Sequence, residues 1–238
     1  MRSPILSESL GWGESHWLDY DFESKTNRNR VIYMEKKKSE AIILRNSDGE
    51  DKDIIAIASD DTDAVERAQI QYGTSLIYPM SCQSAHVSVC PNHQTGRTVS
   101  MQARHIFALT GSFGYELAPE KISGEDREYV KEFIRFYNDN YAVFQNGKYY
   151  RLSNPQTDDY AVFEYVYENK VIVGVMRFKA HAVNLQTTIK LNGLEENRIY
   201  TDKKTGKQYC GSQLMQFGLP LDTSREMNDF YVKAWELY

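Results

Sequence analysis

The chain has 238 residues, 41% of them hydrophobic, which suits one large domain or two small ones with a sizeable core. Its formal net charge of −5 argues against nucleic acid or an anionic membrane as the main partner. The sequence lacks the run of about 18 apolar residues that a transmembrane helix needs and the apolar core of a secretory signal, and its three cysteines favour reduced thiols in the cytoplasm.

The most informative stretch is an acidic segment at residues 59–63, Ser-Asp-Asp-Thr-Asp. It follows the apolar run 54–58, which predicts a short buried strand, and it precedes an amphipathic stretch at residues 64–72, which predicts a helix. Carboxylates at the carboxyl end of a strand, just before a helix, lie where α/β barrels place their catalytic groups.

The predicted helix has a start signal and a stop signal. Thr62 or Asp63 can cap its N-terminus, and Glu66, three residues after Asp63, would complete a capping box. Gly73 provides a left-handed exit from the helix.

The next elements mix strands, loops and one longer helix. Residues 75–78 predict a second buried strand, residues 79–97 a loop-rich connection, and residues 111–117 a further strand with its turn. Ser123 predicts the N-cap of a helix that closes at Asn146-Gly147. The core stripe of this helix has the helical spacing i, i+3, i+4 and i+7: Val130, Phe133, Ile134 and Tyr137.

After about residue 150 the apolar residues change from helical to alternating spacing. The predicted strands cover residues 160–167, 170–178, 185–191, 198–201 and 230–235, and Glu168-Asn169 joins the first two as a hairpin. Consecutive strands with short polar turns predict an antiparallel β-sandwich. We expect residues 156–238 to fold largely independently of the preceding half.

Several motifs occur in a fixed order along the chain: Ser-Asp-Asp-Thr-Asp-Ala-Val-Glu-Arg at 59–67, Ala-His-Val-Ser at 85–88, Pro-Asn-His-Gln-Thr-Gly-Arg at 91–97, Gly-Ser-Phe-Gly-Tyr-Glu-Leu at 111–117, and Tyr-Cys-Gly-Ser-Gln-Leu-Met at 209–215. Together they resemble glycoside hydrolase family 36, the retaining α-galactosidases that act on raffinose-type sugars. The resemblance spans residues 54–238. It implies the end of a (β/α)8 barrel (a TIM barrel) at residues 54–150 and an antiparallel β-sandwich at residues 151–238, and it leaves residues 1–53 unassigned.

The resemblance assigns Asp60 the role of the catalytic acid/base. A retaining glycosidase needs this residue and a second carboxylate as nucleophile, and it uses no cofactor. The family places its nucleophile upstream in a Lys-Trp-Asp motif, which this chain lacks, because Asp19 and Asp21 have no such context. The family also usually has Trp where this chain has Ile57. We therefore expect a truncated or disrupted α-galactosidase that is inactive alone, with α-galactoside oligosaccharides as the family's substrates and a homo-oligomer compatible with the full-length form.

Other interpretations remain open at this point. The aspartates of the acidic segment could merely cap the helix, which is the expectation for Asp63. The β-rich half could instead be a non-catalytic carbohydrate-binding or structural module with aromatic side chains exposed on one sheet face. A Cys-x3-His-x3-Cys-x2-His pattern could bind zinc, but its spacing is unlike common zinc motifs, so we expect no metal there: Cys82, His86, Cys90 and His93. Structural pairing is expected for three further polar residues: Arg97, His105 and Glu116.

Overall fold

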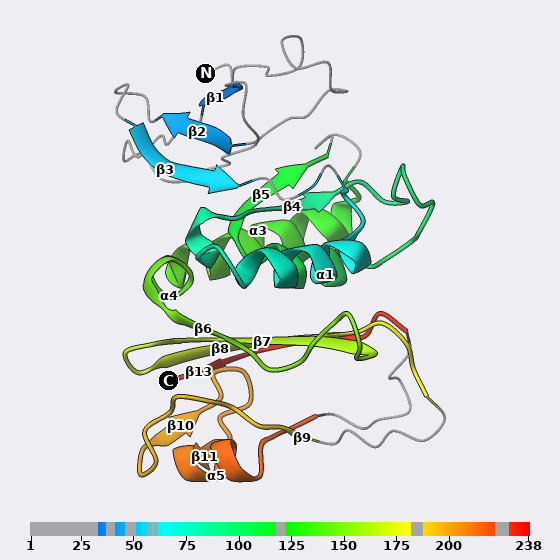
Figure 1. The fold of residues 1–238 in the computed structure, drawn as a ribbon. Helices are drawn as coiled ribbons and strands as arrows, with labels where there is room; N and C mark the ends of the chain where they lie inside the picture. The colour runs from blue at the N-terminus through cyan, green and yellow to red at the C-terminus, as the bar shows by residue number, and fades with distance from the viewer. Residues whose placement is uncertain are drawn as a thin grey trace.

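The computed structural model describes residues 33–36, 41–45, 51–56, 59, 61–117, 122–181, 188–221 and 229–238, the first three ranges by their backbone alone. These residues form several sheets and few helices, arranged in layers (Figure 1). The first sheet is antiparallel and has the strand order β1-β2-β3: β1 (Tyr33–Lys36), β2 (Ala41–Arg45) and β3 (Asp51–Ala56). The strand predicted at 54–58 is therefore present in its first part, and residues 57 and 58 lie outside the described residues.

An α/β unit follows. It consists of α1 (Ala64–Ser75), the 3-10 helix η1 (Met80–Cys82), β4 (Ser84–Ser88), α2 (Met101–Ala108), β5 (Ser112–Glu116), α3 (Gly124–Asp139) and α4 (Tyr141–Asn146). β4 and β5 pair in parallel, from Ser84 opposite Ser112 to Ser88 opposite Glu116. Parallel neighbours need a crossover connection, and α2 provides it.

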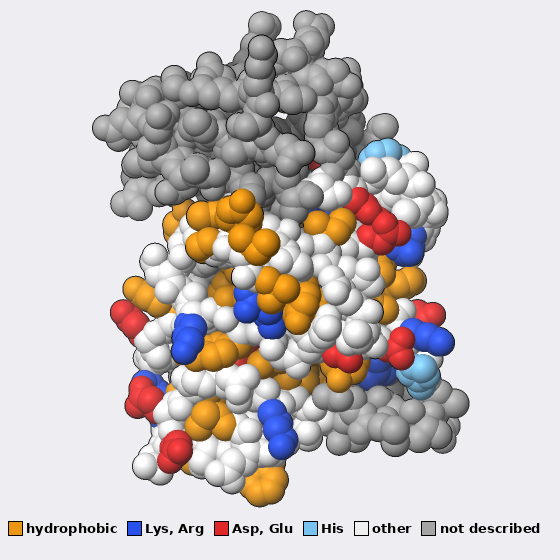
Figure 2. Space-filling model, in the orientation of Figure 1, with side chains coloured by type: hydrophobic (Ala, Val, Ile, Leu, Met, Phe, Trp, Pro, Cys, Tyr) orange, Lys and Arg blue, Asp and Glu red, His pale blue; other side chains and the backbone are white. Residues whose placement is uncertain are grey.

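Two predictions for the segment after the acidic residues are wrong. Helix α1 continues through Gly73 to Ser75 and ends on Leu76, whose backbone is right-handed, so Gly73 is not the exit. The strand predicted at 75–78 is absent, because residues 76–78 form a turn, in which Leu76 is 62% and Ile77 79% exposed. Hydrophobic side chains gather at this end of α1 on the molecular surface (Figure 2).

Strand β4 lies inside residues 79–97, which the sequence analysis assigned to a loop-rich connection. The strand is short and carries polar side chains at Ser84, His86 and Ser88, so its pattern does not stand out from a loop. Structurally it is buried, because Ala85 and Val87 have no exposed surface.

Helix α3 largely agrees with the sequence. The Ser123 hydroxyl accepts a hydrogen bond from the backbone N–H of Asp126, as expected of an N-cap. Val130, Phe133 and Tyr137 are buried along one face. The predicted single helix is instead broken, because α3 ends at Asp139 and the short helix α4 continues to Asn146, with Gly147 as its C-cap.

The chain then enters a four-stranded antiparallel sheet with the order β13-β8-β7-β6: β6 (Lys148–Arg151), β7 (Tyr160–Tyr167), β8 (Lys170–Arg177) and β13 (Val232–Leu237). The predicted hairpin between β7 and β8 is confirmed, and Glu168 in its turn has a positive φ of 52°. The last strand begins two residues later than the expected 230–235.

A second β layer lies beneath this sheet in Figure 1. It contains β9 (Thr188–Ile189), β10 (Ile199–Thr201), β11 (Gln208–Cys210), the short helix α5 (Gly211–Gln216) and β12 (Leu219–Pro220). The strands form two antiparallel pairs, β10 with β11 and β12 with β9. Of the strand predicted at 185–191, residues 185–187 lie outside the described residues.

Both faces of the four-stranded sheet are buried. One face packs on the second β layer through Val162, Val173 and Trp235. The other packs on the α/β unit through Phe163, Tyr165 and Ile172, which share a cluster with residues of α2, α3 and α4. The hydrophobic core thus crosses the predicted boundary at residue 150, which argues against the expected independence of the C-terminal half. No helix among the described residues is long and apolar enough to cross a membrane.

Candidate functional site

The acidic segment between β3 and α1 is braced by its own side chains. Asp60 itself lies outside the described residues, so the structure does not test its predicted role. On either side of it, the backbone N–H of Asp61 donates to the Ser59 hydroxyl at 3.1 Å, and the N–H of Asp63 donates to the Asp61 carboxylate at 2.8 Å. Such side-chain-to-backbone bonds fix the backbone as a turn.

Asp63 is the N-cap of α1, as the sequence predicts. Its Oδ1 accepts hydrogen bonds from the backbone N–H groups of Val65 at 2.9 Å and Glu66 at 3.2 Å, and its Oδ2 accepts one from the Thr95 hydroxyl at 2.6 Å. The Arg97 guanidinium pairs with the same carboxylate, whose side chain is 0% exposed. Burial acts to raise the pKa of Asp63, but the hydrogen bonds and the charge of Arg97 outweigh it, so the pKa is lowered.

Glu66 does not complete a capping box, so that prediction is wrong. The N–H of Asp63, which Glu66 would accept, donates to Asp61 instead. Glu66 forms a side-chain hydrogen bond with Asp61, and this bond is the main reason that the pKa of Glu66 is raised. Asp61 therefore accepts the hydrogen bond from the N-cap N–H that a capping-box glutamate would accept.

A loop from the connection after β4 closes over the acidic segment. Thr62 donates to the Gln94 side-chain oxygen through its backbone N–H at 2.8 Å and its hydroxyl at 3.0 Å. The Asn92 amide donates to the Thr62 hydroxyl at 2.9 Å, and the Ser88 hydroxyl donates to the Thr62 carbonyl at 2.6 Å. Because Ser88 ends β4, these bonds place the segment at the carboxyl end of the parallel strands, where α/β proteins build their sites.

Arg67 lies one turn into α1 and points back toward the acidic segment, as helical side chains do. Its guanidinium is 3% exposed and donates to the carbonyl oxygens of Ser59 and Asp61, both at 3.1 Å, and to that of Ser84 at 2.7 Å. A fourth bond joins it to the Gln71 side chain at 3.2 Å. Sequence analysis missed this residue, although its position four residues after the N-cap was a usable signal.

Two histidines of the α/β unit, His86 and His105, each contact neighbouring polar groups through both ring nitrogens. On β4, His86 contacts the Ser84 hydroxyl through Nε2 and the Glu116 carboxylate through Nδ1 at 3.3 Å. Burial lowers the pKa of His86, while the hydrogen bond that His86 donates to the Glu116 carboxylate opposes this shift. The pairing predicted for Glu116 is thus present, and so is that of Arg97, which pairs with Asp63.

His105 is completely buried. Its Nδ1 lies 2.7 Å from the Met101 carbonyl and its Nε2 lies 2.8 Å from the Tyr115 hydroxyl. Burial lowers its pKa to about 3. A carbonyl can only accept, so Nδ1 carries the proton and Nε2 accepts from Tyr115. His105 is a structural residue, as expected.

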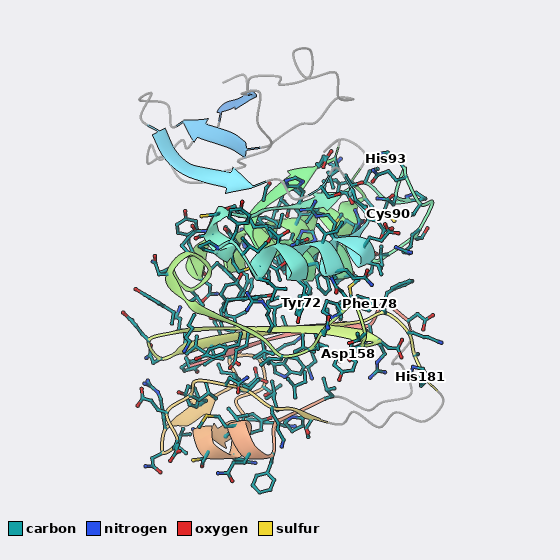
Figure 3. All side chains as sticks on the ribbon, in the orientation of Figure 1. Tyr72, Cys90, His93, Asp158, Phe178 and His181 are labelled. Atoms are coloured by element: carbon teal, nitrogen blue, oxygen red, sulfur yellow. The ribbon has the colours of Figure 1, made fainter. Side chains whose placement is uncertain are left out.

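The zinc pattern is not assembled as a cluster. Cys90 and His93 lie in the connection after β4 (Figure 3), and the Cys90 thiol donates to the Val99 carbonyl. Both ring nitrogens of His86 are engaged with Ser84 and Glu116. Within the ranges that the structure describes, no group of three or more His, Cys, Asp or Glu side chains is placed to hold a metal ion.

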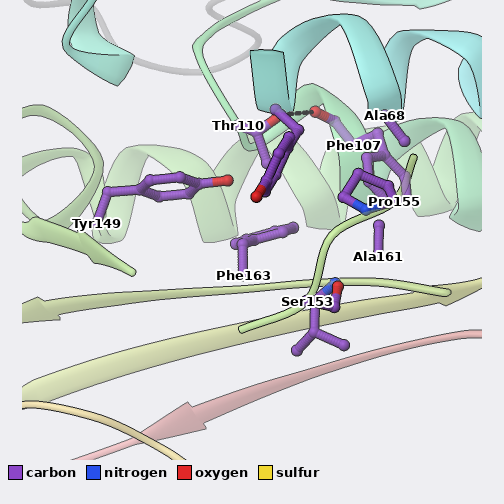
Figure 4. Close-up of a pocket in the computed structure, with 10 residues that line it drawn as sticks. Ala68, Phe107, Thr110, Tyr149, Ser153, Pro155, Ala161 and Phe163 are labelled. Atoms are coloured by element: carbon purple, nitrogen blue, oxygen red, sulfur yellow. Dashed lines mark hydrogen bonds between the residues drawn. The ribbon is translucent and has the colours of Figure 1, made fainter. Parts of the chain in front are cut away.

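A narrow pocket lies between α1, α2 and the four-stranded sheet (Figure 4). Its lining is mainly aromatic and aliphatic, with Tyr72, Phe107, Tyr149 and Phe163 among the larger side chains. No residue of the acidic segment lines it, so this pocket is separate from the candidate site.

The aromatic residues of the four-stranded sheet bear on the alternative of a carbohydrate-binding module. Phe163, Tyr165 and Trp235 are all at least 96% buried. These three belong to the core, whereas Tyr150, Tyr160 and Tyr167 are partly exposed. The acidic segment is the candidate for chemistry.

Comparison with known proteins identifies the family of the chain. Residues 54–147 match the family model for melibiase, and residues 160–237 match the model for the glycosyl hydrolase family 36 C-terminal domain. The chain is 41% identical over 179 residues to the bifunctional α-galactosidase/sucrose kinase AgaSK of Mediterraneibacter gnavus, covering 74% of this chain and 19% of that protein. It is 38% identical over 181 residues to the α-galactosidase AgaA of Geobacillus stearothermophilus, covering 75% and 24%.

Solved structures of α-galactosidases are similar to this chain in fold as well as in sequence. The crystal structure of AgaA superposes with a TM-score of 0.71 at 38% identity, covering 75% of this chain and 25% of that chain. The galactosidase domain of AgaSK gives the same TM-score at 39% identity and the same coverage. The chain thus spans about a quarter or less of the length of these relatives. With both family models matched in order and this similarity along three quarters of its length, the chain belongs to glycoside hydrolase family 36.

Proposed function

We propose that this chain is the C-terminal part of a retaining α-galactosidase that acts on raffinose-type oligosaccharides. Residues 54–150 would supply the last units of a (β/α)8 barrel and residues 151–238 an antiparallel β-sandwich. The parallel pair β4–β5 with its α2 crossover supports the first assignment, and the two β layers around Trp235 support the second. AgaA variants solved with raffinose and with stachyose support the substrate class.

The observation that carries the proposal is the fixed acidic segment at the carboxyl end of β4, in a chain 41% identical to an α-galactosidase. We assign Asp60 the role of acid/base. It would protonate the glycosidic oxygen as the bond breaks, and then, as a base, activate the water that hydrolyses the galactosyl-enzyme.

The nucleophile would come from a part of the enzyme outside the matched residues 54–147 and 160–237. A retaining enzyme needs its two carboxyl groups about 5–5.5 Å apart. Asp61 and Glu66 are tied to each other, and Asp63 is tied to Arg97 and the helix N-terminus, so each already has a structural partner. We therefore infer that the chain alone does not turn over substrate. A cytoplasmic location and a cofactor-free reaction complete the proposal.

The test is complementation. The chain is assayed with raffinose alone and after mixing with the part of AgaA that lies outside the matched region. The proposal expects no galactose release from either piece and release from the mixture, which Asp60→Asn abolishes and Glu128→Gln, on the exposed face of α3, leaves unchanged. Galactose release by the chain alone, or full activity of the Asp60→Asn mixture, would overturn it.

A further inference from the structure

Arg67 holds the backbone on both sides of Asp60. One nitrogen of its guanidinium, Nη1, donates to the carbonyl of Ser59 and to that of Asp61, the residues immediately before and after Asp60. The other terminal nitrogen, Nη2, donates to the carbonyl of Ser84 at the start of β4. A single buried cation thus ties the acidic segment to the parallel strand beside it.

The guanidinium is itself fixed. Its Nε donates to the Gln71 side chain, and the Gln71 amide in turn donates to the Phe107 carbonyl at 2.9 Å and to the Thr110 hydroxyl. Both Arg67 and Gln71 are buried, at 3% and 2% exposure. These bonds connect α2 and Thr110 shortly after it to the acidic segment, and those that the Arg67 guanidinium donates are charge-assisted, which makes them about twice as strong as neutral ones.

We propose that Arg67 is a positioning residue, which sets the backbone conformation around Asp60 and so aims the acid/base. This inference rests on the proposed function, because it takes its importance from the role of Asp60. A general acid must lie within hydrogen-bond distance of the oxygen that it protonates, so a shift of the backbone that carries it lowers the rate even when the carboxyl group remains.

The alternative is that Arg67 only supports β4. The chain offers a matched control for this, because Arg104 on α2 is also buried, at 7% exposure, and also donates to a β4 carbonyl, that of Ser88. Arg104 has no described hydrogen bond to residues 59–63. Arg67→Met and Arg104→Met therefore remove the same charge from similar surroundings, and only the first frees the segment around Asp60.

The test is native-state amide hydrogen exchange on the full chain, read at Asp61, Thr62 and Asp63, whose N–H groups are all hydrogen-bonded in the segment. We expect Arg67→Met to speed exchange at these amides by about tenfold or more through an opening that does not depend on denaturant, as local openings do not. Arg104→Met should leave these three amides within about twofold of wild type, and Arg67→Lys, which keeps a charged donor, should restore part of the protection.

Equal acceleration by Arg67→Met and Arg104→Met, or no acceleration by Arg67→Met, would overturn the inference. If Arg67→Met fails to fold, Arg67→Lys carries the test, because three amides unchanged in that variant would likewise contradict the role. A failure of the proposed function is seen elsewhere: Asp60→Asn would then keep turnover in the complemented enzyme, whatever the exchange rates.

Discussion

A buried carboxyl group in the second half of the chain makes the stability of the fold depend on pH. Glu164 lies in β7, has 0% exposure, and faces the cluster that contains Val162 and Val173. One carboxyl oxygen accepts from the backbone N–H of Asn192 at 2.8 Å, and the other has no partner in the described residues. Burial raises the pKa of Glu164 from 4.5 to about 8, and the bond from Asn192 opposes this only in part.

The direction in which stability changes with pH follows from the difference between the Glu164 pKa of the folded and the unfolded chain. The unfolded chain loses the proton near pH 4.5, whereas the folded protein keeps it up to about pH 8. The contribution of Glu164 to the free energy of unfolding is thus fully present below pH 4.5 and is lost as pH rises from 4.5 to about 8. At about 1.4 kcal/mol per pKa unit, the total change across the window is about 5 kcal/mol, of which about 3 kcal/mol is already lost at pH 7.

Glu164→Gln should remove this pH dependence, because glutamine does not titrate. The measurement is urea unfolding at several pH values between 4.5 and 8.5, with the free energy of unfolding of the variant compared with wild type at each. We expect the difference to move in favour of the variant by about 3 kcal/mol between pH 4.5 and 7.

The control is Glu128→Gln on α3. The ion pair with Lys131 lowers the pKa of Glu128 from 4.5, so its contribution to stability changes only as pH falls below about 4.5. The difference in unfolding free energy between this variant and wild type should therefore stay nearly constant from about pH 4.5 to 8.5. Parallel stability curves for wild type and Glu164→Gln would refute the reasoning, because the carboxyl group would then be as well solvated in the folded protein as in the unfolded chain.

Three further changes test other parts of the structure. Asp63→Asn should cost about 3 kcal/mol in urea unfolding, well above the roughly 1 kcal/mol of a simple cap, because the buried carboxylate also holds Arg97; a cost near 1 kcal/mol would contradict this. The pKa of His105 is lowered to about 3, so wild type should lose stability as pH falls below 6.5, by about 3 kcal/mol at pH 4.5. His105→Gln should reduce this loss, and an equal loss in the variant would contradict burial as the cause of the lowered pKa. Gly193→Ala should destabilise by about 2 kcal/mol more than Gly206→Ala, because both have a φ near 70° but only at Gly193 would the added Cβ meet the Tyr150 hydroxyl, 1.9 Å away; equal costs would rule out the clash.

Elements with strong local signals could be predicted from the sequence. The Ser123 cap, the stripe through Val130 and Phe133, and the hairpin at Glu168 each depend on a few neighbouring residues, and each is present. Asp63 as a cap belongs to the same group, because a carboxylate just before an amphipathic stretch satisfies the free N–H groups of the first helical turn.

The missed elements depend on distant partners. Strand β4 is polar at alternate positions and becomes a strand because β5 pairs with it and α2 covers it. The apolar residues Leu76 and Ile77 suggested a strand but have no such partner, so they stay in a turn. Local pattern cannot distinguish these two cases.

The candidate site likewise has a part that the sequence predicts and a part that only the fold shows. The sequence located the acidic segment, but many of the contacts that brace it join residues 17 to 34 positions apart, such as Ser84 with Arg67 and Arg97 with Asp63. No periodicity indicates that a serine carbonyl or a glutamine side chain will meet that segment. Only the fold brings these groups together.

The most direct test of the central claim uses azide. In the mixture of this chain with the unmatched part of AgaA, Asp60→Asn is assayed with an aryl α-galactoside whose phenol leaves without protonation, so that the galactosyl-enzyme forms and then lacks a base to activate water. Azide needs no such base. The account predicts that added azide restores turnover and that the product is α-galactosyl azide. Turnover of Asp60→Asn that azide leaves unchanged, with galactose as the product, would contradict the assignment of Asp60 as the acid/base.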